Sequence, residues 1–408
     1  MKELLIGIDW SWGHYDVCIL APNGAILSQF RIARTTTGLE QLQKKINKFE
    51  ISPNSCLVGI ETAHDILVDF LLSCQYQVYV IAPSIVNSSR GRFGSSGAHS
   101  DKTDARLIAE LLRTDQARFA PWRPDSTILT QIKVRMSHID SLTKTIIQHN
   151  NRLRSILLRV YPQPLTAFSK LTLSITLNFL VTYPTPTALD QVSYAEFAGF
   201  CRRHHCNRPG WIKNWFEGLH QPAPTAAAAV VQAYQPEISF LARLLLTLLE
   251  EKKEAINTVQ TLCDQHPDHA IFASLPGIGK VLLPKFLVMF GEDRQRFPTP
   301  QSIRQLAGTC PVTKQSGKKR QVVFRKACNH AYRDAVQQHA VASVRKADWA
   351  WAYYLAARKR GHHKNDAFRR LANRWLGIIW KLWQTHQLYD ESYHLKQIHK
   401  QRQVEPVI

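Results

Sequence analysis

The N-terminal part of the chain alternates between short apolar runs and stretches with apolar residues at helical spacing. LLIGID (4–9), SCLVGIE (55–61) and QVYVIAP (77–83) are runs of the length typical of buried strands, and the first two end in an acid. Residues 14–33 alternate apolar and polar positions around Pro22-Asn23-Gly24, which is a hairpin signal. The pattern predicts one strand, a hairpin, and then two further buried strands.

Helical spacing fills the intervals between these strands. It predicts helices over residues 36–50 and 62–74, and a third helix after the last strand. This order predicts a mixed sheet flanked by helices, an α/β fold. Sites in such sheets gather at the carboxyl ends of strands, where Asp9 and Glu61 lie.

The third helix begins in the stretch Ser100-Asp101-Lys102-Thr103-Asp104-Ala105-Arg106. Ser100 can cap the helix, and Asp101 and Asp104, three residues apart, share one face of it. Acids are also favoured at a helix N-terminus for their charge alone, so decoration of the helix start is one reading. The other is a cation held between the two carboxylates, either a metal ion or a side chain such as Lys102 or Arg106.

The rest of the chain is predicted to be helical. A proline-punctuated linker at 118–126 precedes a long helix at about 126–160, and a second long helix spans about 236–264. These two helices are expected to pair as an antiparallel or intermolecular coiled pair. Trp375, Trp380 and Trp383 are expected to pack in a core. The predicted domains are residues 1–120, 121–265 with a small helical insertion at about 161–235, and 266–408.

Charge narrows the class of partner. The 408 residues carry a net charge of +21, which points to a polyanion. No run is long and apolar enough to cross a membrane, and the N-terminus lacks a signal-peptide layout, so we expect an intracellular protein that binds nucleic acid. Eight scattered cysteines suggest reduced thiols. Cys201 and Cys206 lack a second pair of zinc ligands, so an exposed basic turn is preferred there over a zinc site.

Asp9, Glu61, Asp101 and Asp104 form a set, since two end core strands and two begin the helix after the third. Four converging carboxylates need cations, and carboxylate oxygens suit Mg²⁺ or Mn²⁺. Two such ions can stabilise the attacking and leaving oxygens at a phosphate. The set therefore predicts metal-dependent phosphoryl transfer on nucleic acid.

Two further segments carry candidate nucleic-acid contacts. LPGIG (275–279) has the shape of a helix–hairpin–helix turn, in which Gly277 and Gly279 would let backbone amides approach a phosphate, although a plain glycine turn is nearly as good an account. Ser316 is expected in a basic loop between helices, followed by a helix carrying further polar residues. The candidate nucleic-acid-binding residues are Lys102, Arg106, Gly277, Gly279, Lys280, Lys314, Lys318, Lys319, Arg320, Arg325, Lys326, Asn329 and Arg333.

GID (7–9), GIE (59–61) and DKTDA (101–105) resemble the DEDD motif of insertion-sequence transposases of the IS110 family, which are related to the Piv invertase and are also called bridge recombinases. LPGIG and the QSG at 315–317 resemble the C-terminal region of the same family. The resemblance covers both ends of the chain, and the inserted segment at 161–235 departs from a minimal member.

The resemblance implies a RuvC-like, ribonuclease H-type domain that holds Mg²⁺, coiled-coil helices for dimerisation, and a helical C-terminal domain with Ser316 as nucleophile. It implies a structured non-coding guide (bridge) RNA that pairs with donor and target DNA, and a homodimer that assembles to a tetramer with composite active sites. It also implies a bacterial cytoplasmic protein that acts at the nucleoid. From the residues alone, an ordinary solvated loop serine is the preferred reading of Ser316.

Three other classes share parts of this pattern. A metal-dependent junction nuclease needs the four acids but no serine, and an RNA-binding protein could keep the fold without catalysis. Actin-like sugar kinases also open with a strand ending in GID, but they need glycine- and threonine-rich phosphate loops where this chain has Trp-Ser-Trp-Gly (10–13). Trp10 and Trp12 could stack on a base, but packing at the core edge is the preferred expectation.

Overall fold

The computed structural model describes residues 3–63, 65–93, 100–317 and 319–404. The chain divides into two compact units, 1–124 and 125–408, and each is described by itself. The boundary falls inside the predicted proline-punctuated linker. The further boundary expected near residue 265 lies within the second unit.

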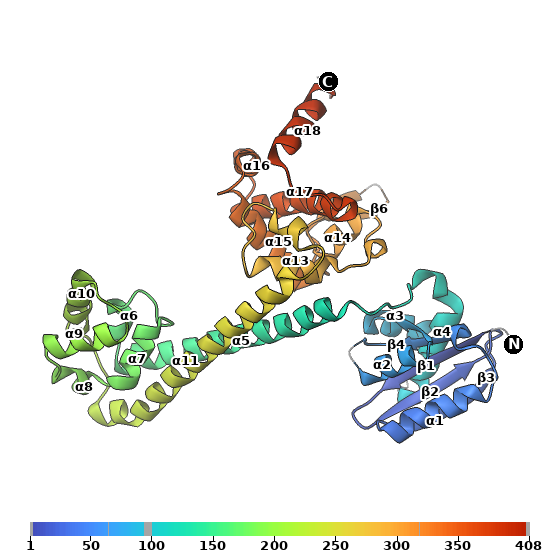
Figure 1. The fold of residues 1–408 in the computed structure, drawn as a ribbon, viewed down its shortest axis with the longest axis horizontal. Coiled ribbons are helices and arrows are strands. Elements are labelled where there is room, and N and C mark those ends of the chain that lie inside the picture. Colours follow the sequence, from blue (N-terminus) through green and yellow to red (C-terminus); the bar gives the residue numbers. More distant parts are fainter. Residues whose placement is uncertain (1–2, 64, 94–99, 318, 405–408) are drawn as a thin grey trace. The chain divides into compact units, whose positions relative to one another are not determined.

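The first unit is built on a five-stranded mixed sheet with the order β3-β2-β1-β4-β5 (Figure 1). Its first three strands pair antiparallel, whereas β1, β4 and β5 run parallel. The predicted α/β fold is confirmed at this level. The strands are β1 (Leu4–Trp10), β2 (His14–Leu20), β3 (Ile26–Ala33), β4 (Cys56–Ile60) and β5 (Gln77–Val80).

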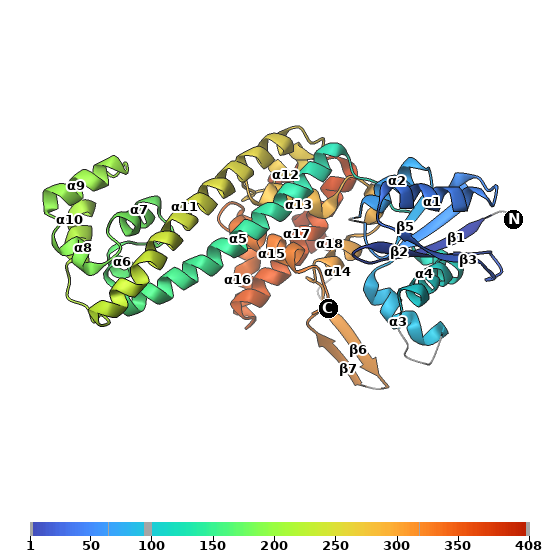
Figure 2. The ribbon, with the colours of Figure 1, turned by 90° about the horizontal axis from the view of Figure 1, so that it is seen from below.

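Alternate residues of each strand face opposite layers of helices. Leu4, Ile6 and Ile8 of β1 belong to the core under α1 (Thr36–Asn47) and α2 (Ile66–Ser73). Leu5 and Gly7 face α4 (Asp101–Asp115) instead. Figure 2 shows α1 and α2 on one side of the sheet, with α4 and α3 (Pro83–Phe93) on the other. The sequence pattern predicted every element of this unit except α3.

The second unit contains the two long helices, α5 (Thr127–Val160) and α11 (Ala228–Asp264), which pack along each other. His138 pairs with Glu251 and Arg152 with Glu237, so 14 residues forward along α5 correspond to 14 residues backward along α11. This register makes the pair antiparallel. α11 begins earlier than predicted because Pro236 is accommodated inside it, rather than before its first turn.

The insertion between these helices folds as a small helical module. Its core gathers the fully buried aromatic rings of Phe168, Phe179, Phe197 and Phe200, with neighbouring ring centroids 5.3–6.2 Å apart. Cys201 is buried inside a helix of this module, so the exposed turn expected at this residue is wrong, and burial raises the pKa of its thiol to about 12. The helices of the module are α6 (Gln163–Ala167), α7 (Ser174–Thr182), α8 (Pro186–Asp190), α9 (Tyr194–Arg203) and α10 (Pro209–Leu219).

The C-terminal part packs helices around buried tryptophans, as predicted. Trp375 and Trp383 are fully buried and donate to Ser343 Oγ and Gly291 O. None of the helices described is long and apolar enough to cross a membrane. The elements are α12 (His269–Ala273), α13 (Leu282–Phe290), α14 (Pro300–Leu306), β6 (Val312–Ser316), β7 (Lys319–Val323), α15 (His330–Ser343), α16 (Asp348–Lys359), α17 (Lys364–Thr385) and α18 (Glu391–Val404).

Candidate active site

Two acids of the predicted set lie at the same edge of the sheet. β1 and β4 are parallel neighbours with Ile8 paired to Ile60, so Asp9 and Glu61 each follow the last paired position. Because side chains alternate along a strand, both acids share the face of Gly7 and Gly59, which is the face covered by α4. Strand register and alternation therefore bring the two carboxylates together beneath the start of α4.

The glycines of the GID and GIE motifs let α4 approach the sheet. A Cβ on Gly7 would lie 2.0 Å from Ala105 O, and one on Gly59 would lie 2.6 Å from Ile108 Cγ2. Gly7 and Gly59 are themselves paired across β1 and β4. The motif that ends each strand in an acid thus also contains the glycine that lets α4, which carries the other two acids, pack closely on the sheet.

α4 presents Asp101 and Asp104 in its first turn, as predicted. Ser100 caps the helix by accepting from the Thr103 amide, and Thr103 Oγ1 accepts from the Ser100 amide in return. Asp104 accepts a two-pronged ion pair from Arg90 of α3 at 2.6 and 2.9 Å. The side-chain cation anticipated beside the acid pair is therefore Arg90 rather than Lys102 or Arg106, both of which are exposed.

Electrostatics shows that the four acids act on one another. Burial raises the pKa of Asp9 to about 7, with further contributions from Glu61, Asp104 and Asp101 in that order. Burial and Asp104 also raise the pKa of Glu61, and Arg90 opposes them. Four acids offset by the guanidinium groups of Arg90 at Asp104 and Arg31 at Asp101 leave an excess of negative charge, which suits a carboxylate cluster that binds a cation.

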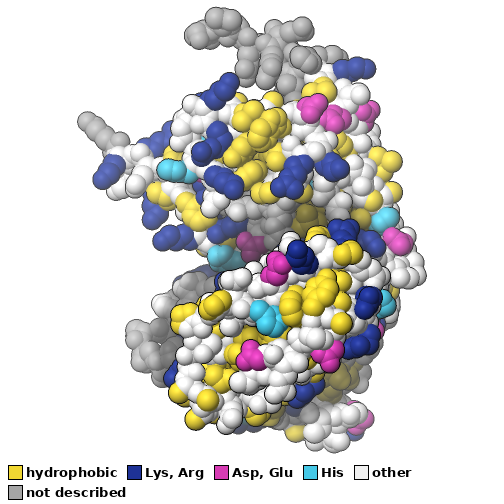
Figure 3. All heavy atoms as spheres, turned by 90° about the vertical axis from the view of Figure 1, so that its left-hand side faces the viewer, with side chains coloured by type: hydrophobic (Ala, Val, Ile, Leu, Met, Phe, Trp, Pro, Cys, Tyr) yellow, Lys and Arg dark blue, Asp and Glu magenta, His cyan; other side chains and the backbone are white. Residues whose placement is uncertain are grey.

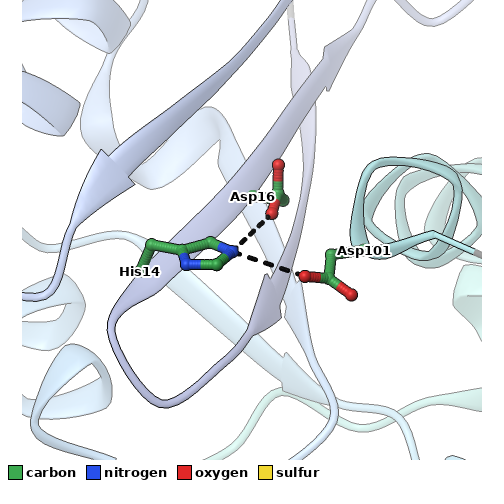
Figure 4. Close-up of side chains that lie close together, drawn as sticks. All are labelled: His14, Asp16 and Asp101. Carbon is green, nitrogen blue, oxygen red and sulfur yellow. Dashed lines mark hydrogen bonds and ion pairs between the residues drawn. The ribbon is translucent and has the colours of Figure 1, made fainter.

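His14 joins the site from β2, and sequence reasoning missed it. Its Nε2 lies 3.3 Å from both Asp16 and Asp101 (Figure 4). Its Nδ1 shares a hydrogen bond with Ser11 Oγ. Arg31 also binds Asp16 at 2.9 Å. The alternation of HYD at 14–16 could have placed His14 and Asp16 on the face of Asp9, because Asp16 is paired with Asp9 across the strands.

The donor set fits a hard divalent cation. Asp9, Glu61, Asp101 and Asp104 supply only carboxylate oxygens, and burial, together with the other three acids, raises the pKa of Asp9 to about 7. Within the described residues, the group whose ligand atoms all lie within 4.8 Å of one another is instead His14, Asp16 and Asp101. Of the predicted four, Asp104 is engaged by Arg90 and Asp101 by His14, so a cation would compete with these side chains for both acids of α4.

Ser316 lies in the second unit on a β-hairpin, so the predicted loop is wrong. β6 and β7 pair with Ser316 opposite Lys319, which leaves a two-residue turn containing Gly317 at φ +54°. The hairpin extends away from the helices of its unit (Figure 2), and Ser316 is exposed. Both strands are mostly polar and lack a buried face, so they give no strand alternation to detect.

The basic candidates near Ser316 divide into two groups. Lys314, Lys319 and Arg320 are exposed on the hairpin, whereas Lys318 lies outside the described residues. Arg325 and Lys326 precede α15 instead of lying on it, because Asn329 caps that helix by accepting from the Tyr332 amide.

Arg333 is on α15, as expected, but it serves the fold. Its guanidinium donates to Arg325 O at 2.6 Å and lies 4.6 Å from the centroid of the Phe324 ring. The guanidinium of Arg369 also lies over this ring. These contacts anchor the base of the hairpin. They leave Arg333 less available for a phosphate than the hairpin lysines.

The LPGIG turn lies between α12 and α13. Gly277 adopts φ +81°, and a Cβ there would lie 2.8 Å from the Ala342 backbone, so the first glycine is needed for a close approach to α15. Gly279 and Lys280 are exposed, with open space around Gly279. Packing therefore accounts for Gly277, while Gly279 and Lys280 are the accessible part of the turn.

Trp10 and Trp12 do not pack at the core edge, contrary to expectation. They are 44% and 89% exposed, because β1 ends at Trp10 and the turn to β2 lifts Trp12 away from the sheet. Both follow Asp9 closely in the sequence.

A mixed sheet whose central strand ends carry acids, completed by two acids on a covering helix, is the arrangement expected of a DEDD-type transposase domain. A transposase family model with the DEDD domain matches residues 6–162, and a model described as the IS116/IS110/IS902 transposase family matches residues 269–355. The chain belongs to the IS110 family of insertion-sequence transposases.

Relatives match along nearly the whole chain. The putative transposase of the IS117 mini-circle of Streptomyces coelicolor is 30% identical over 95% of both chains. A 44.8 kDa protein of insertion element IS116 from Streptomyces clavuligerus is 23% identical over 96% of this chain and 97% of its own. A 42 kDa protein of insertion element IS900 from Mycobacterium paratuberculosis is 24% identical over 80% and 82%. The inserted segment at 161–235 thus falls within the span of full-length similarity.

Proposed function

We propose that this transposase is an RNA-guided recombinase that cuts and rejoins donor and target DNA through a covalent phosphoserine intermediate. Mg²⁺ or Mn²⁺ held by Asp9, Glu61, Asp101 and Asp104 assists the reaction. The observation that carries the proposal is the convergence of these four carboxylates, with the pKa of Asp9 raised to about 7 by burial and by the other three.

The carboxylates prepare one half of the chemistry. When bound, the cation supplies Lewis-acid stabilisation of the phosphate oxygens at the scissile bond. The strand ends fix Asp9 and Glu61, while the α4 cap fixes Asp101 and Asp104. His14 pairs with Asp101 and Arg90 pairs with Asp104, which holds the two α4 acids in place. A bound cation would compete with both side chains for these carboxylates.

Ser316 supplies the other half. Its Oγ attacks phosphorus, its proton passes to a carboxylate of the cluster, and the bond from phosphorus to one DNA oxygen breaks, that oxygen taking a proton from water. The product is a phosphoserine diester and a free DNA hydroxyl. Attack by the hydroxyl of another strand reverses these steps and releases Ser316, so no external energy source is needed. Lys314, Lys319 and Arg320 lie on the same exposed hairpin, where they can bind the phosphate.

Assembly completes the proposed site. The carboxylates and Ser316 belong to different units of the chain, and an exposed hairpin is suited to reach the carboxylates of another subunit. We propose that α5 and α11 mediate a homodimer as a coiled coil and that two dimers form a tetramer. A structured guide RNA and donor and target DNA account for the net charge of +21.

The test is recombination of donor and target plasmids by protein purified with its RNA. Ser316→Ala should abolish both strand exchange and the protein–DNA adduct that survives denaturation, while RNA binding persists. Thr313→Ala is the matched control, because Thr313 is another exposed hydroxyl residue on β6. An adduct that forms without Ser316 would contradict the serine mechanism.

A metal-dependent structure-specific nuclease is the second candidate, because the four acids lie together within one unit without Ser316. It predicts that Ser316→Ala still cleaves branched DNA and that no covalent adduct forms with the unaltered protein. Asp104→Asn abolishes cleavage under both proposals, so the serine variant and the adduct distinguish them.

A further inference from the structure

Figure 3 shows Lys and Arg side chains around hydrophobic ones on the face of the molecule that it draws. Between α14, α17 and the start of α18, a cavity of about 670 Å³ opens within the second unit. None of its lining residues belongs to the hairpin with Ser316 or to the set of four carboxylates. Its size falls in the range of small-ligand sites.

Three cations line this cavity against a single carboxylate. They are Arg304 of α14 and Arg374 and Lys381 of α17. The carboxylate, Asp390, is occupied in capping α18, where it accepts from the Tyr393 amide at 3.1 Å. In the described part of the chain, the side chains of Arg374 and Lys381 have neither an ion pair nor a hydrogen bond, so the cavity holds an uncompensated positive charge.

The guanidinium of Arg304 is held in a fixed position. Its Nε donates to Asn373 O at 3.0 Å, and its terminal nitrogen lies so close to Gly377 that a Cβ there would be 2.1 Å away. The guanidinium of Arg304 therefore packs directly on α17 at Gly377, where any larger residue would collide with it. The Nε bond leaves the two terminal nitrogens of Arg304 without an acceptor among the described residues.

Two half-buried guanidinium groups that line one cavity repel each other, so their arrangement is unfavourable without an anion. Burial lowers the pKa of Arg304, and the charge of Arg374 lowers it further. A phosphate oxygen pair between Arg304 and Arg374 would relieve both effects, since guanidinium groups bind phosphate with two parallel hydrogen bonds.

The remaining wall is aromatic, and two of its rings are fixed. Trp380 donates to Phe297 O at 2.7 Å, and the hydroxyl of Tyr389 accepts from Trp349 at 2.8 Å. Tyr393 is 61% exposed at the opening. His394 adds a buried Nε2 without a hydrogen-bond partner. Such a wall offers flat surfaces for a base and one polar atom to meet its edge.

We propose that this cavity binds one unpaired nucleotide of a nucleic-acid strand, with its phosphate between Arg304 and Arg374 and its base against the aromatic wall. A base inside a duplex is stacked on both faces and is not free to enter, so the site selects an unpaired position. The proposal concerns strand binding and is independent of the serine chemistry proposed above.

The experiment uses the full chain and a short fluorescent single-stranded oligonucleotide carrying one photoreactive 5-iodouracil. Arg304→Ala and Arg374→Gln should each weaken binding about tenfold or more, because each removes charge-assisted hydrogen bonds to phosphate. Arg360→Ala is the matched control, since Arg360 is an exposed arginine outside the cavity, and it should change binding by less than about twofold. Gly377→Ala should weaken binding as well, by unseating Arg304 with no loss of charge.

Crosslinking and competition test the nucleotide itself. The photoreactive base should crosslink to the segment containing Tyr389 and Tyr393, and adenosine monophosphate should compete better than inorganic phosphate. Equal losses for Arg374→Gln and Arg360→Ala would overturn the proposal, as would crosslinks confined to other segments. Competition by phosphate as strong as by the nucleotide would reduce the cavity to a simple anion site. Thermal unfolding of each variant checks that the fold is kept.

Discussion

The carboxylate cluster and the serine hairpin are built in opposite ways. Asp9 and Glu61 are placed by strand register, and Asp101 and Asp104 by a capped helix whose approach depends on Gly7 and Gly59. Ser316 instead ends a polar strand whose side chains are mostly exposed and which, among the described strands, pairs with β7 alone. One half of the proposed site is thus preformed in the free protein, whereas the other depends on what the hairpin meets.

The largest expected effects are losses of strand exchange, and the two regions should differ in whether such a loss is accompanied by a loss of stability. Ser316→Ala and Asp104→Asn should each lower strand exchange by at least about a thousandfold, because each removes a group that the proposed reaction requires. Ser316→Ala should leave the thermal unfolding midpoint unchanged, since its side chain is exposed. Asp104→Asn should lower the thermal unfolding midpoint, because it breaks the ion pair with Arg90.

These two variants are measured by recombination of plasmid substrates and by scanning calorimetry without added metal. A Ser316→Ala midpoint that fell as far as that of Asp104→Asn would show that the hairpin is part of a packed core. The comparison between a preformed and an exposed half would then fail.

The same contrast explains what the sequence could predict. Strands buried on both faces form continuous apolar runs, and the acids that end two of these runs mark the strand ends, so Asp9 and Glu61 could be identified from the sequence pattern. Ser100 and the two acids after it predict a capped helix start. The helix α3 has weak apolar spacing, so neither it nor the ion pair from Arg90 to Asp104 could be anticipated.

The hairpin could not be predicted for the opposite reason. A strand buried on neither face has no apolar positions to alternate, so Lys314, Ser316 and Lys319 look like a loop. The exposure of Trp12 was also missed, because a large aromatic residue ordinarily packs and only the tertiary position of the turn leaves it 89% exposed.

Substitution of glycines compares the stability of the two regions. Gly7→Ala should destabilise the protein by about 3 kcal/mol, because its Cβ would lie 2.0 Å from the backbone oxygen of Ala105 and α4 would have to move. Gly317→Ala should cost about 1 kcal/mol, since the space around it is open and only its φ of +54° is unfavourable. Chemical denaturation measures both. A smaller loss for Gly7→Ala than for Gly317→Ala would contradict the close approach of α4.

Substitution of Arg90 tests how much its ion pair with Asp104 stabilises the metal-free carboxylate cluster. Arg90→Gln deletes the ion pair to Asp104 and should lower stability without metal by about 1 kcal/mol, because the pair is only partly shielded from solvent. The freed carboxylate should bind Mn²⁺ several-fold more tightly, since the cation no longer competes with a guanidinium. Titration calorimetry measures this affinity. Arg92→Gln is the control, because Arg92 pairs with Asp115 at the far end of α4.

The smallest expected effect is the pH dependence of the metal-free cluster. The pKa of Asp9 is raised from its ordinary 3.8 to about 7, so the folded protein holds a proton that the unfolded chain has already released. Stability contributed by this group is therefore present at acid pH and is lost as the pH rises from 3.8 to about 7. After discounting for partial exposure, we expect this loss to be about 1 kcal/mol.

Asp9→Asn keeps the shape of the protonated acid but cannot lose a proton, so its stability should change less over the same range. Added Mn²⁺ should restore the stability of the unaltered protein at neutral pH and have little effect on Asp9→Asn, because the cation replaces the proton as the partner of the carboxylates. Ser316→Ala serves as the control and should follow the unaltered protein throughout. Identical pH profiles for Asp9→Asn and the unaltered protein would mean that the four carboxylates do not share charge in solution, and the preformed half of the comparison would be lost.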